Sequence, residues 1–142
     1  ESAKAKTNYD EAELLLGLHW TDSRKAEAVQ QRLIALQQGD GGWAQKAEMK
    51  PDAYATGLAL FALRESGLAV THPVYGKGVE YLRRTQLADG SWFVASRAPK
   101  FQPYFQSGFP HNHDQWISAI ATAYAVRAMA PAVVAERVVA SR

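Results

Sequence analysis

Three side chains that commonly bind metal ions lie close together in the last third of the chain. In the stretch FPHNHDQW, residues 109 to 116, His111, His113 and Asp114 fall within four positions. Two imidazoles and a carboxylate suit Zn or a non-haem iron, and the sequence implies no cofactor other than such a divalent metal. The same residues also fit a polar loop in which Asp114 caps the next helix and both histidines are hydrogen-bonded.

Aromatic residues accompany this polar cluster. An insertion loop over residues 95–113 contains prolines and aromatic side chains, whereas a plain connector is short and polar. We therefore expect the insertion to fold over one end of the helices that it connects. Aromatic faces beside a few polar groups can form the mouth of a ligand site. The residues expected to contact a ligand are Tyr54, Tyr104, Phe105, Phe109 and Trp116.

The rest of the chain reads as helices of two kinds. Segments 22–38 and 71–86 have apolar residues at three- and four-residue spacing, which predicts helices buried on one face only. Segments 51–68 and 114–130 are apolar on nearly every side, which predicts helices surrounded by protein. A further helix is expected over 9–20, and Pro131 should end or kink the last helix. The alternation of the two kinds indicates an inner and an outer layer.

A seven-residue pattern, Q-x-x-D-G-x-W, follows each one-faced helix. It reads QQGDGGW at residues 37–43 and QLADGSW 49 positions later, at residues 86–92. Each copy predicts a corner with three parts, in which a glycine takes positive φ, a glutamine bonds freed backbone groups and a tryptophan packs over the neighbouring hairpin. The residues given these structural roles are Gln37, Gly41, Trp43, Gln86, Gly90 and Trp92.

The two all-round apolar helices also repeat, as ATGLALFAL at residues 55–63 and ATAYAVRAM at residues 121–129. This double repeat, over roughly residues 9–130, resembles the QW repeat of squalene-hopene and oxidosqualene cyclases, which protein prenyltransferase β subunits share in looser form. The resemblance implies an all-α fold, an α/α toroid of antiparallel helical hairpins with inner and outer layers. Residues 1–142 would form a single domain of about two and a half hairpins, a partial toroid.

The catalytic motifs of those families are not complete in this chain. The stretch DAYATG, residues 52–57, lies where the resemblance places the cyclase D-x-D-D-T-A motif; Asp52 and Thr56 match it, but Tyr54 and Ala55 replace the catalytic Asp pair. A tyrosine with a pKa of about 10 cannot protonate an alkene. The prenyltransferase zinc site needs a cysteine, and the chain has none.

The charge and hydropathy of the chain narrow the classes of partner that we expect it to bind. The 16 basic and 14 acidic residues are scattered, which predicts no nucleic-acid or anionic-membrane partner. We find no apolar run that approaches roughly 18 residues, and so expect no transmembrane segment. The first residues lack the apolar core of a signal peptide, and the sequence assigns the chain to no compartment.

Two functional hypotheses follow. The favoured one is a non-catalytic toroid module, structural or binding an apolar or isoprenoid-like ligand or a partner helix, and completed by the remainder of a larger toroid or by self-association. The alternative is an enzyme of the same superfamily that acts through His111, His113 and Asp114, with or without a metal.

Overall fold

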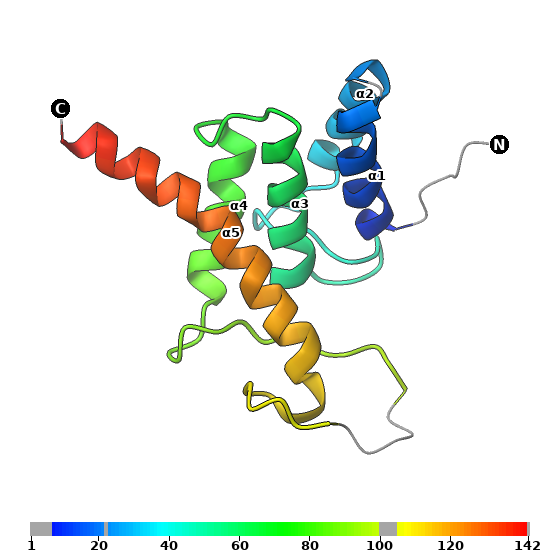
Figure 1. The fold of residues 1–142 in the computed structure, drawn as a ribbon, viewed down its shortest axis with the longest axis vertical. Coiled ribbons are helices and arrows are strands. Elements are labelled where there is room, and N and C mark those ends of the chain that lie inside the picture. Colours follow the sequence, from blue (N-terminus) through cyan, green and yellow to red (C-terminus); the bar gives the residue numbers. More distant parts are fainter. Residues whose placement is uncertain (1–6, 22, 100–104, 142) are drawn as a thin grey trace.

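The computed structural model describes residues 7–21, 23–99 and 105–141, and over these residues the protein is all-helical (Figure 1). No strand occurs among them, which confirms the all-α prediction. The elements are α1 (Asn8–Thr21), α2 (Ser23–Ala35), α3 (Ala53–Glu65), α4 (Pro73–Thr85), the 3₁₀ turn η1 (Asn112–Asp114) and α5 (Gln115–Ala140).

Helix α3 is the centre of the molecule. It packs against α1 on one side and α5 on the other, while α2 packs mainly on α1 and α4 packs on α3 and α5. The N-terminal ends of α1, α3 and α5 lie toward the same end of the molecule, where the long connection between α4 and α5 also runs (Figure 1). The side chain of Asp52 caps α3 by accepting from Ala55 N at 2.9 Å, and Gly67, with φ of 95°, follows its C-terminal end.

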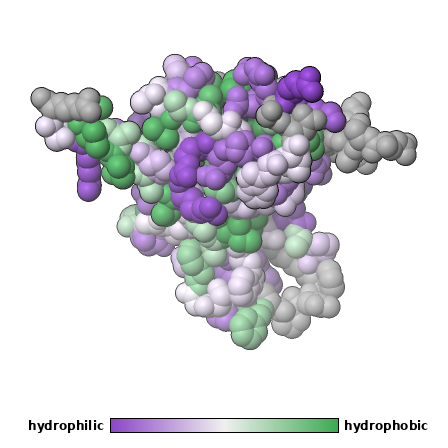
Figure 2. Space-filling view, turned by 45° about the horizontal axis from the view of Figure 1, so that its top comes forward, coloured by the Kyte–Doolittle hydropathy of each residue, from purple (hydrophilic) through white to green (hydrophobic). Residues whose placement is uncertain are grey.

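Helix α5 differs from its prediction in length. Pro131 neither ends the helix nor prevents its continuation to Ala140. A proline removes one intrahelical hydrogen bond and crowds one carbonyl. The extension also contacts α4, because Arg83 of α4 holds Glu136 with Nη2–Oε distances of 2.8 Å. The far end of α5 projects from the body of the molecule with apolar side chains on its surface (Figure 2).

The burial of α5 also departs from the prediction. Nine of the 13 residues of α3 are buried, as expected for a helix surrounded by protein. Only one side of α5 is buried, through small and polar residues, because no described helix covers its other side. The large apolar residues that remain exposed on it are Trp116, Ile120, Val126, Val134, Val138 and Val139.

The apolar composition of α5 bears on the expectation that the chain has no transmembrane segment. Among the described residues, the stretch Asn112–Ala140 is long and apolar enough to cross a membrane by length and composition alone, which the sequence reading had not anticipated. Core helices of soluble proteins pass the same test, and the alanine side of α5 packs against α3. We assign this helix no membrane role.

The two Q-x-x-D-G-x-W corners have the same internal geometry. In the first, Gln37 Nε2 donates to Gly41 O at 2.9 Å, and in the second Gln86 Nε2 donates to Gly90 O at 2.9 Å. Gly41 and Gly90 have φ of 91° and 83°, where a side chain is strained. An aspartate in each corner, Asp40 or Asp89, accepts from the backbone N–H two residues later.

The tryptophan of each corner is bonded to the helix before the corner and to the helix after it. Trp43 and Trp92 are 0% and 1% exposed, and their indole N–H groups donate to carbonyls of the preceding outer helix, Leu33 O at 2.7 Å and Leu82 O at 2.9 Å. Their backbone N–H groups donate to the hydroxyls of equivalent threonines on α3 and α5, which are Thr56 and Thr122. A repeat in sequence is therefore also a repeat in hydrogen bonding.

Candidate functional site

His111 is held by a hydrogen-bond chain at the second corner. Its Nε2 lies 3.0 Å from Ser91 Oγ, which also lies 2.7 Å from Asp89 Oδ1. If the serine hydroxyl donates to Asp89, His111 must donate to the serine, so the histidine cannot act as the base that activates this hydroxyl. Hydrogen bonds from the Ser91 hydroxyl and backbone N–H lower the pKa of Asp89, and the nearby His111 adds to the effect.

Two phenylalanines fix the imidazole ring of His111. The ring centroids of Phe93 and Phe109 lie 5.4 and 6.2 Å from it, both in edge-on geometry. His111 and Asn112 adopt positive φ of 84° and 46°, an uncommon conformation for residues other than glycine. The insertion loop is thus fastened to the second corner through one histidine.

The three candidate metal ligands do not converge. Asp114 stands at the N-cap position of α5, as expected, but its side chain makes no cap hydrogen bond there, and its Oδ1 instead accepts from Ser96 N at 2.8 Å. Residues 112–114 form a single 3₁₀ turn, in which successive side chains point about 120° apart. Across the described part of the chain, no group of three or more His, Cys, Asp or Glu side chains is placed to hold a metal.

Gln115, which the sequence reading overlooked, organises the end of the insertion. It is fully buried, accepts from Ser107 N at 2.6 Å, and donates to Asn112 O and Gln106 Oε1 at 2.8 Å. Of the predicted ligand residues nearby, Trp116 donates to Phe105 O at 3.2 Å. Phe105 is 78% exposed and Trp116 50%. Tyr104 lies outside the described residues.

Tyr54, the remaining predicted ligand residue, belongs to a different group, which we call the aromatic row. The row consists of Tyr9 on α1, Tyr54 and Phe61 on α3, and Tyr124 on α5. Tyr9 stacks on Tyr54 at 6.2 Å, and Tyr124 lies 6.0 Å from both Tyr54 and Phe61. Four rings from three helices therefore form one continuous surface.

The aromatic row is uncharged along most of its length. Burial is the largest cause of a raised pKa at Tyr54, and the neighbouring Tyr9, Tyr124 and Glu13 raise it further, to about 12. Burial also raises the pKa of Tyr124, and the Glu13 carboxylate is the largest cause of a raised pKa at Tyr9. These hydroxyls stay protonated at neutral pH, so the side chains of the row are themselves uncharged, and the nearest charge on the Tyr9 side is the Glu13 carboxylate.

Arg127 closes one end of the row. Its guanidinium lies 4.0 Å from the centroid of the Phe61 ring, which is a cation–π contact. Arg127 is one helical turn after Tyr124 on α5, and Phe61 is two turns after Tyr54 on α3. The spacing of seven between Tyr54 and Phe61 was visible in the sequence, but the meeting of three helices was not.

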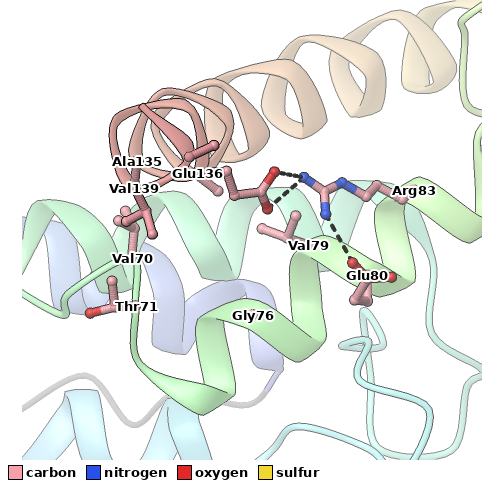
Figure 3. Close-up of a pocket in the computed structure, with 11 residues that line it drawn as sticks. Val70, Thr71, Gly76, Val79, Glu80, Arg83, Ala135, Glu136 and Val139 are labelled. Atoms are coloured by element: carbon pink, nitrogen blue, oxygen red, sulfur yellow. Dashed lines mark hydrogen bonds and ion pairs between the residues drawn. The ribbon is translucent and has the colours of Figure 1, made fainter. Parts of the chain in front are cut away.

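A separate groove lies between α4 and the projecting half of α5. It has a volume of about 590 Å³ and is lined mainly by small and apolar residues, among them Val70, Val79, Ala132 and Val139. Arg83 lies at its edge, where it pairs with Glu80 on its own helix and with Glu136 across on α5 (Figure 3). Because its charged groups are paired with one another and the rest of its lining is small or apolar, this groove suits packing rather than chemistry.

Comparison with known proteins finds a sequence similarity that covers only part of the chain. No protein-family model matches the chain. Over 89 residues the chain is 37% identical to a squalene–hopene cyclase from Bradyrhizobium diazoefficiens, a match that covers 55% of this chain. The chain spans 12% of the length of that cyclase. The relation is therefore to a segment of a cyclase, and it agrees with the all-helical fold.

Proposed function

We propose that this protein is a segment of a squalene cyclase-like α/α toroid and that its aromatic row contacts an apolar, isoprenoid-like ligand. The proposal rests on one observation, the continuous aromatic surface across α1, α3 and α5. Aromatic faces bind hydrocarbon chains by dispersion and by removal of apolar area from water. A branched polyene is long enough to lie across several rings.

Three further findings support the toroid segment. The paired corners repeat their hydrogen bonds on successive outer helices, and α1, α3 and α5 line up side by side while α2 and α4 lie against them. The partial match to a squalene–hopene cyclase is the third. In such an arrangement the row belongs to the inner helices.

Binding without catalysis is the function that this surface supports. Tyr54, whose hydroxyl has a pKa of about 12, is too weak an acid to protonate an alkene. The carboxylate of Asp52 is already engaged, because its two oxygens accept from Ala55 N at 2.9 Å and Gln45 Nε2 at 2.8 Å. Burial raises the pKa of Asp52, although these hydrogen bonds oppose the rise.

The alternative of an enzyme that uses His111, His113 and Asp114 has weaker support. His111 and Asp114 are each engaged with a different residue of the connection, Ser91 and Ser96. The two side chains are therefore hydrogen-bonded to different partners rather than to one shared group. We therefore keep the binding proposal.

Equilibrium dialysis against farnesol, a short isoprenoid alcohol, tests the proposal. Tyr54→Ala and Tyr124→Ala should each weaken binding about tenfold, which corresponds to about 1.4 kcal/mol for a lost aromatic contact. Trp20→Ala is the matched control, because Trp20 is 77% exposed near the end of α1 and lies outside the row. Equal affinity in all four proteins, or no binding at all, would refute the proposal.

A further inference from the structure

Helix α4 shows how an outer helix sits on a corner. Gln37 Nε2 donates to Val74 O at the start of α4, at 2.9 Å. A methyl group added to Gly41 would meet Lys77 O at 2.5 Å, so this corner lies directly against the α4 backbone. Helix α4 in turn needs a glycine where it faces the corner, because a methyl group on Gly78 would meet Leu60 at 2.8 Å and Trp43 at 3.0 Å.

The second corner offers the same groups, and no helix of the described residues lies on them. Gln86 is exposed, and a methyl group on Gly90 would meet only Gln86 Nε2, at 4.0 Å. In the 66-residue repeat of the inner helices, Leu60 corresponds to Val126. Leu60 is 0% exposed beneath α4, whereas Val126 is 54% exposed. The difference between the two corners is thus the difference between a covered and an uncovered site.

A groove occupies the place of the absent helix. It has a volume of about 310 Å³ and is mostly apolar. We call it the second seat, and its lining residues are Gln86, Trp92, Val126, Met129, Ala130, Val133 and Arg137. Trp92 contributes to it as Trp43 contributes to the seat of α4.

We infer that the second seat binds an amphipathic helix built like α4, with a glycine where the helix crosses Trp92 and Val126. The free N–H of Gln86 would donate to a carbonyl in the first turn of that helix, four residues before the glycine, as Gln37 does to Val74. The partner is a further outer helix of the same repeat. This inference rests on the corner geometry and is independent of ligand binding at the aromatic row.

A second copy of this chain is a poorer occupant. Its own α4 is already seated, with the Tyr75 hydroxyl bonded to Ala128 O at 2.7 Å. In α2 the position that corresponds to Gly78, 49 residues earlier, is Val29, and this valine is only 3% exposed. Neither outer helix of a second copy therefore presents a free glycine to the seat.

Disulfide trapping tests the inference, since the chain has no cysteine of its own. The probe is a synthetic peptide of residues 71–86 with Gly78→Cys, equilibrated in a glutathione buffer with the Val126→Cys protein. Val134→Cys is the matched protein control, because Val134 is 61% exposed on the same helix but outside the second seat. The control peptide has Glu80→Cys, which lies about 200° around the helix from position 78.

We expect the Val126→Cys protein and the Gly78→Cys peptide to form a disulfide with an effective concentration about tenfold higher than that of either control pair. A Gln86→Ala change in the Val126→Cys protein should lower that value. Equal trapping in all pairs would overturn the inference. So would disulfide-linked dimers of the Val126→Cys protein that form as readily as the peptide adduct, since a second copy would then occupy the seat. Farnesol binding plays no part in this readout.

Discussion

Gly76 and Gly78 lie two residues apart in α4, yet a methyl group should have opposite effects at the two positions. At Gly76 nothing lies within 4 Å of an added Cβ, so Gly76→Ala should stabilise the protein by about 0.5–1 kcal/mol through helix propensity. At Gly78 the same gain is opposed by contacts at 2.8 Å with Leu60 and 3.0 Å with Trp43. Overpacking of this kind costs about 1–3 kcal/mol.

The difference between the two variants isolates the packing cost, because the propensity gain is common to both. Leu60 and Trp43 are both 0% exposed and have little room to move. We therefore expect Gly78→Ala to be about 1–3 kcal/mol less stable than Gly76→Ala. Urea unfolding followed by far-ultraviolet circular dichroism measures both free energies under the same conditions. Equal free energies of unfolding would refute the close seating of α4 on the first corner.

The corner residues and one buried acid give three further predictions. Trp43→Ala and Trp92→Ala should each lower the free energy of unfolding in urea by about 3–5 kcal/mol. The loss should be larger for Trp43→Ala, because α4 covers the Trp43 ring. Losses below about 1 kcal/mol would contradict the structural roles of both tryptophans. In the same assay, Gln37→Ala should lower the free energy of unfolding by about 1–2 kcal/mol and Gln86→Ala by less, because Gln37 donates to two carbonyls and Gln86 to one. The reverse order would count against an uncovered second corner. Burial raises the pKa of Asp52, so protonation favours the folded state and the stability of the wild type relative to Asp52→Asn should fall as pH rises through the acidic range; a difference that grows with pH would show the opposite sign.

The helices could be predicted from the sequence because they depend on local pattern. Apolar spacing predicted the helices, although α5 is buried on one side only, and the repeated motif predicted the corners, whose turns need the positive φ of Gly41 and Gly90. The length of α5 could not be predicted in this way. Its continuation past Pro131 is accompanied by an ion pair between Arg83 and Glu136, 53 residues apart in the chain.

The candidate site was harder to predict than the fold. Proximity in sequence suggested a cluster of His111, His113 and Asp114, but the geometry of a 3₁₀ turn separates neighbouring side chains. The aromatic row shows the converse, because Tyr9, Tyr54 and Tyr124 are far apart in sequence and meet only through the packing of three helices. Helix packing of this kind leaves no local signal.

The central claim is that a hydrocarbon ligand lies on the aromatic row, and nuclear magnetic resonance of the protein with ring-labelled tyrosine tests it most directly. On addition of farnesol, the ring signals of Tyr9, Tyr54 and Tyr124 should shift together and saturate, because aromatic rings in contact with a ligand change their environment. The signals of Tyr75 and Tyr81, which are buried on α4, should stay in place. Shifts of Tyr75 and Tyr81 alone, or unchanged signals from the three tyrosines of the row, would contradict the account.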